Sequence, residues 1–199
     1  MRRTLWTSIA LTVVMTVLTG LAYPLVVTGI AQGLLHHQAN GSLVAGPNGQ
    51  IVGSELVGQS FSDPNGNPLP IWFQPRLSAA GTGYDAMSSS GSNLGPTNPA
   101  LISAVTSAMA AYRTFNRLSA TTPVPVDAVT SSGSGLDPEI SIANARLQVP
   151  RVAAVRGLPL AQVQHLVDQA TVGRVLGVMG EPGVNVLDLN LSLARLGSR

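Results

Sequence analysis

The 199-residue sequence contains no cysteine and no lysine, and its eleven basic residues are all arginine. Without cysteine the chain can form no disulfide and has no thiolate ligand or thiol nucleophile. Without lysine it cannot contain the phosphate-binding loop of a P-loop nucleotidase. The arginines are scattered and the net charge is only +2. No run of basic residues is suited to a phosphate backbone, so we expect no nucleic-acid partner.

Histidine is also scarce, with His36, His37 and His165 as the only three. The first two directly follow a long apolar run. The third lies beside Gln164 and Asp168, which indicates the solvated face of a helix. The sequence has no G-x-S-x-G serine elbow, and it lacks the His or Cys clusters that bind zinc. We therefore predict no catalytic residues, no metal site and no tightly bound cofactor, which is typical of a non-enzymatic protein.

Charge is absent from Leu5 to Leu35, a run of 31 residues without Asp, Glu, Lys or Arg. About 20 apolar residues suffice to cross the bilayer core, which is about 30 Å thick, as a helix. Arg2 and Arg3 precede the run, and the next charged residue is Glu55. Because positively charged flanks stay in the cytoplasm, the pattern predicts a cytoplasmic N-terminus.

The run can be interpreted either as a signal peptide that is cleaved off or as a transmembrane helix that remains part of the protein. A cleaved secretory signal would use Arg2 and Arg3 as its basic region, but the apolar core of a signal usually has about 7–15 residues. The present run is much longer. We therefore favour a single-pass helix in residues 1–35, with its span at about 8–30, followed by an extracytoplasmic domain of residues 36–199.

Small and hydroxylated residues recur every four positions in the run, at Ser8, Thr12, Thr16, Gly20 and Pro24. Such a stripe lets another helix approach closely, so we predict that its first four residues contact a partner helix. The alternative is that the hydroxyls only bond carbonyls of their own helix. The proline predicts a kink in the outer half of the span.

Beyond the apolar run, the pattern predicts an α+β domain with a small sheet. Residues 50–57 and 126–130 are expected to contribute strands. Asn98 and Pro99 suit the cap and first turn of a helix. The apolar face of that helix would comprise Leu101, Val105, Ala108, Tyr112 and Phe115.

The C-terminal third is predicted to be mostly helical. Ser141 can cap a short helix that ends before Pro150. Pro159 opens another helix, whose apolar face would comprise Leu160, Val163, Val167 and Ala170. Residues 184–191 alternate between apolar and polar, with a slip in phase. This pattern indicates either a strand with a bulge or a strand that passes into a helix.

The long segment 61–99 has little periodicity, yet it contains Trp72 and Phe73. We predict an ordered, irregular loop that these aromatic residues hold in place. Its end, 90–96, and a second stretch, 132–138, are rich in Ser and Gly. Such loops can present backbone N–H groups to an anion. By themselves, the residues favour the simpler interpretation, in which the glycines serve only tight turns.

Five stretches carry a resemblance to a known family: GSELVGQSF (53–61), SGSNLGPTNP (90–99), SGSGLDP (132–138), RVAAVRGL (151–158) and GEPGVNVLDLN (180–190). In this order they resemble the KdpC family, the C subunit of the bacterial potassium-transporting Kdp ATPase. Two residues depart from the family pattern. Glu139 stands where the family usually has His, and Val172 stands where it has an acidic residue.

The resemblance implies an accessory subunit of an ATP-driven, high-affinity potassium import complex in the bacterial inner membrane. It would support assembly and stability. Its expected partners are a potassium-channel-like subunit, a P-type ATPase subunit and a small membrane subunit. The alternative is an exported, membrane-anchored binding module that acts outside a pump complex.

The resemblance also implies a catalytic chaperone that raises the ATP affinity of the hydrolytic subunit, with ATP contacts in the loop at Ser90, Gly91, Ser92, Asn93 and Gly95. The predicted topology conflicts with that site, because it places the loop outside the cell, where ATP is absent. ATP is then expected only through the partner subunit. We predict instead that Asn93 and Leu94 dock onto an extracytoplasmic face of the partner subunits.

Overall fold

The structure is a computed structural model that describes residues 1–197. The chain divides into two compact units, Met1–Leu43 and Val44–Arg199, which we describe separately. The first unit consists of α1 (Arg2–Val17), a π-helical turn η1 (Leu18–Ala22), α2 (Tyr23–Leu34) and the short α3 (His36–Ala39).

The helix from Arg2 to Leu34 is long and apolar enough to cross a membrane. This finding agrees with the apolar helix predicted from the run without charges. A helix satisfies its own backbone hydrogen bonds, which a segment in the bilayer core requires because no water is present there to do so.

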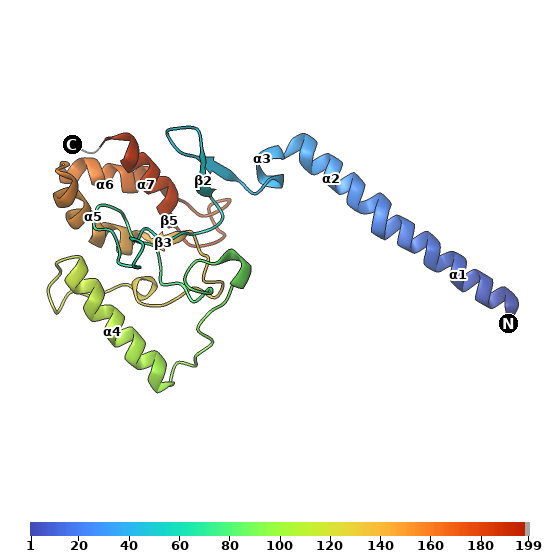
Figure 1. Ribbon diagram of the computed structural model, residues 1–199, viewed down its shortest axis with the longest axis horizontal. Helices are drawn as coiled ribbons and strands as arrows, with labels where there is room; N and C mark the ends of the chain where they lie inside the picture. Colours follow the sequence, from blue (N-terminus) through green and yellow to red (C-terminus); the bar gives the residue numbers. More distant parts are fainter. Residues whose placement is uncertain (198–199) are drawn as a thin grey trace. The chain divides into compact units, whose positions relative to one another are not determined.

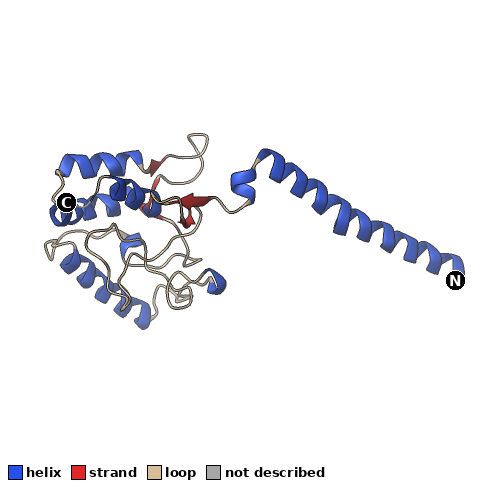
Figure 2. Ribbon diagram, turned by 45° about the horizontal axis from the view of Figure 1, so that its top comes forward, coloured by secondary structure: helices blue, strands red, loops and turns tan. Residues whose placement is uncertain are grey.

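The π-helical turn η1 ends two residues before Pro24, so the helix departs from regular α-helical geometry just before the proline. Proline has no backbone N–H, which leaves the carbonyl four residues earlier without its helical partner. A π turn is a common way to absorb such a mismatch within a helix. Figures 1 and 2 show α1 continuing into α2 as one helix. A kink at Pro24 stays a prediction.

The second unit contains two small sheets (Figure 2). One is the hairpin of β1 (Leu43–Ala45) and β2 (Ile51–Ser54). The other has the order β3-β5-β4, with all pairs antiparallel. It comprises β3 (Glu139–Ser141), β5 (Gly183–Asn185) and β4 (Thr171–Val172). The unit is therefore α+β with a small sheet, as predicted, and the strand expected within 50–57 is β2.

Three helices pack around the second sheet: α5 (Ile142–Arg156), α6 (Leu160–Gln169) and α7 (Val186–Arg195) (Figure 1). Their inward faces form the core with the central strand. The buried apolar residues of this core include Ile140, Ala145, Val149, Val152, Val163, Val167, Val184, Leu189 and Leu193. The phase slip in 184–191 marks the point where β5 passes directly into α7, capped by Asn185.

Helix α5 corrects one prediction, because it continues through Pro150 to Arg156. A proline inside a helix costs roughly 3 kcal/mol. Val149 and Val152, on either side of it, are both buried in the core. Their burial offsets the cost of the proline, an effect that the local sequence does not reveal. Of the apolar face predicted for α6, Val163 and Val167 are buried, whereas Leu160, the first residue of the helix, is exposed. Leu166, which was not predicted, is also buried in the core.

The strand predicted in 126–130 is also wrong. Residues Val126–Ala128 form a short 3-10 turn, η3. The turn aims the Asp127 carboxylate at the start of α5, where it accepts hydrogen bonds from the backbone and hydroxyl of Ser141 and from the Asn144 amide. An acidic group at a helix N-terminus is favourable, and this tertiary contact outweighs the strand propensity of two valines.

Segment 61–99 is irregular and ordered, as predicted, with one short 3-10 turn, η2 (Ala86–Ser88). Phe73 is fully buried in the core, and the Trp72 ring packs on Phe61 with centroids 6.2 Å apart. The segment leads into α4 (Pro99–Phe115), where the Asn98 side chain accepts from the Ala100 N–H at 2.9 Å, as expected of a cap. The predicted apolar face of α4 is only half-buried, and none of its 17 residues is fully buried.

Candidate partner-docking site

The two Ser/Gly loops, 90–96 and 132–138, lie against each other. The Ser90 N–H donates to the Ser134 carbonyl at 2.9 Å, and the Ser89 hydroxyl donates to the same oxygen at 2.9 Å. A Cβ at Gly91 would come within 3.0 Å of the Gly133 oxygen. The sequence predicted both loops, and the fold brings them together across about 40 residues of chain.

Gly135 shows why glycine is needed at this contact. Its φ is +69°, and a Cβ there would lie 2.6 Å from the Ser90 carbonyl oxygen and 2.8 Å from the Ala80 nitrogen. Its N–H donates back to Ser132, to the carbonyl and the hydroxyl. The glycine therefore serves a tight turn and a close approach of backbone, as the simpler interpretation of the loops proposed.

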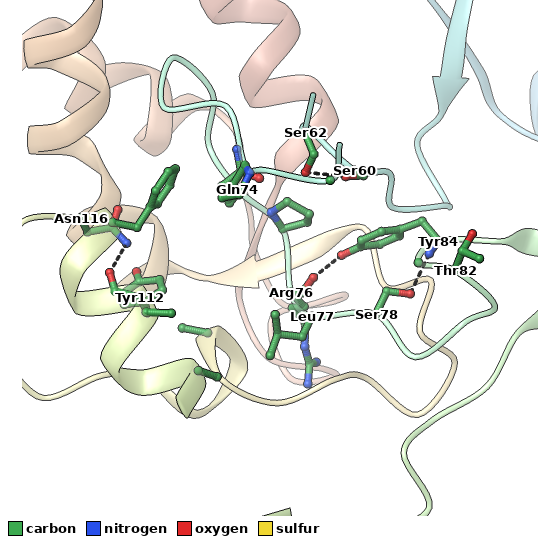
Figure 3. A pocket seen from close by; sticks show the side chains of 18 residues that line it. Ser60, Ser62, Gln74, Arg76, Leu77, Ser78, Thr82, Tyr84, Tyr112 and Asn116 are labelled. Carbon is green, nitrogen blue, oxygen red and sulfur yellow. Dashed lines mark hydrogen bonds between the residues drawn. The ribbon is translucent and has the colours of Figure 1, made fainter. Parts of the chain in front are cut away.

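A second layer of side chains supports these loops. Arg76 forms an ion pair with Asp137 at 2.9 Å, and the Ser78 hydroxyl donates to the Gly135 carbonyl at 2.6 Å. The Tyr84 hydroxyl donates to the Arg76 carbonyl at 2.5 Å (Figure 3). Burial, with the nearby Asp137 charge as a lesser cause, raises the pKa of Tyr84. Its hydroxyl therefore stays protonated and remains a donor at neutral pH.

A third stretch of the sequence joins the site at Gly58. The Gly58 N–H donates to the Leu136 carbonyl at 2.8 Å, and a Cβ at this glycine would meet the Asp137 oxygen at 2.5 Å. Three of the five stretches that carry the family resemblance, 53–61, 90–99 and 132–138, thus meet in one place. These three stretches of the resemblance therefore form one packed feature of the domain.

A cavity of about 390 Å³ adjoins this feature, between α4 and segment 74–84 (Figure 3). Tyr112 and Phe115 line one side, and Leu77 and Tyr84 line the other. The Tyr112 hydroxyl is already engaged, since it donates to the Asn144 side chain at 2.7 Å. The walls therefore offer apolar surface together with hydroxyls, of which those of Ser78, Tyr84 and Tyr112 already donate hydrogen bonds within the chain.

The residues predicted to dock lie at the exposed end of the first loop. Asn93 has φ +52°, in the left-handed region, and its side chain and that of Leu94 are exposed. Ser92 and Gly95 are exposed beside them, whereas Ser90 and Gly91 are half-buried against the second loop. The structure therefore separates a supporting part of the loop from a projecting part. Contact between Asn93 or Leu94 and a partner stays a prediction.

The stripe in the apolar helix is exposed along its whole length. The Ser8 hydroxyl donates to the Thr4 carbonyl at 2.9 Å, which is the local bond that the alternative interpretation proposed. A Cβ at Gly20 would meet only the Thr16 methyl, at 4.0 Å. A role for Ser8, Thr12, Thr16 and Gly20 in helix packing stays a prediction.

Sequence reasoning missed three supporting residues, Gly58, Arg76 and Tyr84. One signal was present, because Arg76 is the single basic residue between Arg3 and Arg113. His165 lies on the exposed face of α6, as predicted. Across residues 1–197, no group of three or more His, Asp or Glu side chains could hold a metal ion.

The two departures from the family pattern border the same glycine. Val172 is paired with Gly183 in the sheet, and a Cβ at Gly183 would lie 2.6 Å from a carboxylate oxygen of Glu139. Burial raises the pKa of Glu139, with a smaller contribution from the Asp137 charge. Both departures thus lie beside β5, and Glu139 also directly follows the second Ser/Gly loop, where its N–H donates to the Asp137 side chain at 3.2 Å.

These features define a class: a small α+β domain that follows a candidate membrane span and holds two Ser/Gly loops packed against each other. The family model described as "K+-transporting ATPase, c chain" matches residues 5–195, and the chain belongs to this family, KdpC. It is 52% identical over 196 residues to the potassium-transporting ATPase KdpC subunit of Mycobacterium tuberculosis (strain H37Rv), covering 98% of this chain and all of that protein.

Two proteins of the same name from Caulobacter are similarly related. The subunit of Caulobacter sp. (strain K31) is 54% identical over 178 residues, and that of Caulobacter vibrioides (strain NA1000) is 53% identical over 178 residues. Each alignment covers 89% of this chain and 86% of the relative. The resemblance drawn from the five stretches is confirmed, and the chain is a KdpC subunit of a potassium-transporting ATPase.

Proposed function

We propose that this chain is a non-catalytic assembly subunit that docks onto the other subunits of the pump through the projecting part of loop 90–96. The observation that supports this proposal is that the loop has a supported part and an exposed part. Ser90 and Gly91 are fixed against the second Ser/Gly loop, while Asn93 and Leu94 are exposed, Leu94 at 38%. Binding residues on a loop with rigid support lose little conformational entropy on contact.

The proposed arrangement places the N-terminus in the cytoplasm and the α+β domain outside the inner membrane. Arg2 and Arg3 at the start of a 33-residue apolar helix support this orientation. The partners are the potassium-channel-like subunit and the P-type ATPase subunit that the family resemblance implies, with a small membrane subunit beside them.

A direct nucleotide site on the loop has less support. Phosphate groups are commonly held by Arg or Lys. Arg76, the basic residue that the fold brings to these loops, is already paired with Asp137 at 2.9 Å. In our proposal the catalytic-chaperone effect on ATP affinity is exerted through subunit contacts, with no ATP held at Ser90, Gly91, Ser92, Asn93 or Gly95.

The test is recovery of the complex in mild detergent through a tag on this chain, quantified by mass spectrometry. Asn93→Ala combined with Leu94→Ala should lower recovery of the other pump subunits while leaving the unfolding temperature of the full-length chain unchanged. Ser119→Ala on the exposed turn after α4 is a matched control. Unchanged recovery with the double variant, together with saturable ATP binding that the variant abolishes, would overturn the proposal.

A further inference from the structure

A second exposed surface lies between β4 and β5, in residues 172–182, which we call the finger. Five large apolar side chains on it are exposed: Val172, Val175, Leu176, Val178 and Met179. Leu176 is 85% exposed and Val178 is 74% exposed. Exposed apolar side chains that gather on one segment are candidates for an interaction site. The docking loop proposed above does not use it.

The finger has a defined fold. The Val175 N–H donates to the Met179 carbonyl at 2.9 Å, and the Met179 N–H donates back to the Val175 carbonyl at 3.0 Å. Below this pair, one guanidinium nitrogen of Arg174 contacts both carboxylate oxygens of Glu181, at 2.9 and 3.0 Å. The tip is therefore held in shape, and its two charged side chains neutralise each other.

Leu176 at the tip has φ +53°, in the left-handed region that glycine adopts readily and leucine does not. Its neighbour Gly177 also has a positive φ, +75°. Both positive φ values belong to the tight turn that joins Val175 to Met179. Among residues 1–197, no packing covers the Leu176 side chain, which is 85% exposed. Such outliers are a recognised starting point for inferring function.

We propose that the finger is an apolar knob that inserts into an uncharged, apolar socket on a neighbouring protein subunit of the same potassium-transporting complex. This inference rests on the proposed function, because it needs a pump complex to dock onto. The neutral tip matches such a socket, since an unpaired charge buried in an interface is costly.

The finger fits a protein socket better than the bilayer surface. Segments that lie in the membrane interface use Trp or Tyr together with unpaired basic residues. The finger has neither Trp nor Tyr, and its one basic residue, Arg174, is paired with Glu181. Its fixed, strained tip also suits a preformed pocket, because a preorganised knob loses little entropy on binding.

The experiment uses the complex purified in mild detergent through a tag on the full-length chain. Leu176→Asp places a charge at the tip and should lower recovery of the other pump subunits by at least about tenfold. Leu160→Asp is the matched control: Leu160 is also exposed, and it opens α6, where an acidic residue is tolerated. It should leave recovery unchanged.

A second variant separates loss of binding from misfolding. Leu176→Gly relieves the left-handed strain, so the unfolding temperature of the full-length chain should stay the same or rise while recovery falls. Equal recovery for Leu176→Asp, Leu160→Asp and the unchanged chain would overturn the finger and leave the proposed function standing. Recovery of no pump subunit by the unchanged chain would overturn the proposed function itself.

Site-directed crosslinking identifies what the finger touches. The chain has no cysteine, so Leu176→Cys carries a single photoactivatable thiol reagent at the tip. A covalent adduct with a protein subunit of the pump, formed in membranes, supports the inference. Adducts confined to lipid, or to a second copy of this chain, would overturn it.

Discussion

The side-chain amide of Asn190 holds both backbone polar groups of Phe73. Its Oδ1 accepts from the Phe73 N–H at 2.9 Å, and its Nδ2 donates to the Phe73 carbonyl at 3.0 Å. Gln148 does the same for the next residue, Gln74, at 2.7 and 3.0 Å. Two amides, from α7 and α5, thus replace the partner strands that this irregular segment lacks. This clamp of Asn190 and Gln148 fixes the start of the segment that leads to Arg76 and the candidate docking site.

Removing this clamp should destabilise the domain. Asn190→Ala leaves the buried N–H and carbonyl of Phe73 without these partners, and each unsatisfied group costs about 1–3 kcal/mol. We expect the free energy of unfolding to fall by about 2–5 kcal/mol, measured by denaturant titration of the full-length chain in detergent. Asn65→Ala, at an exposed turn, is the control and should have little effect. Equal stability of the two variants would contradict the role of the clamp.

Glu139 should make stability depend on pH in a defined direction. Burial raises the pKa of this carboxyl in the folded state, so the folded protein favours its neutral form. The stability that it contributes is present below its unfolded pKa and is lost as the pH rises through the folded pKa. Glu139→Gln, which is neutral at every pH, should therefore raise the unfolding temperature at pH 7.

The size and pH range of this effect provide the check. At about 2–4 °C per kcal/mol for a chain of this length, we expect a rise of a few degrees or less at pH 7. The rise should disappear near pH 3, where the carboxyl is protonated in both states. A difference that persists at low pH would show that the glutamine acts by packing instead of by charge. Asp168→Gln, at an exposed position on α6, is the control.

Gly20→Leu tests the stripe in the apolar helix. Within the chain, a Cβ at Gly20 meets only the Thr16 methyl at 4.0 Å, so a larger side chain fits the isolated helix. A partner helix packed on the stripe would be pushed away, which should reduce recovery of the complex while membrane insertion stays intact. Gly29→Leu, also in open space on the same helix, is the matched control. Equal recovery for both variants would favour a plain anchor.

The orientation of the chain can be read by thiol labelling, since the protein has no cysteine of its own. Met87 is 94% exposed in the α+β domain, and Thr4 lies at the start of the apolar helix. With the N-terminus inside, a membrane-impermeant thiol reagent should label Met87→Cys in intact cells and should label Thr4→Cys only after lysis. The reverse pattern would contradict the proposed topology.

Several features followed from the sequence because their causes are local. The apolar helix was predicted from an uninterrupted run without charge, and the Asn98–Pro99 start of α4 from cap chemistry within two residues. The two Ser/Gly loops were visible as turn-forming composition. The family resemblance could also be recognised from the sequence, because it rests on short motifs in a fixed order and does not depend on which residues are in contact.

Tertiary structure decided what depends on distant partners. Pro150 stays inside α5 because core burial outweighs a lost hydrogen bond, and the predicted strand at 126–130 becomes a turn because Asp127 finds the start of α5. The contact between Gly91 and Gly133 and the clamp on Phe73 likewise have no local signature. Each arises from packing between segments that are far apart in sequence, which the order of a few neighbouring residues does not encode.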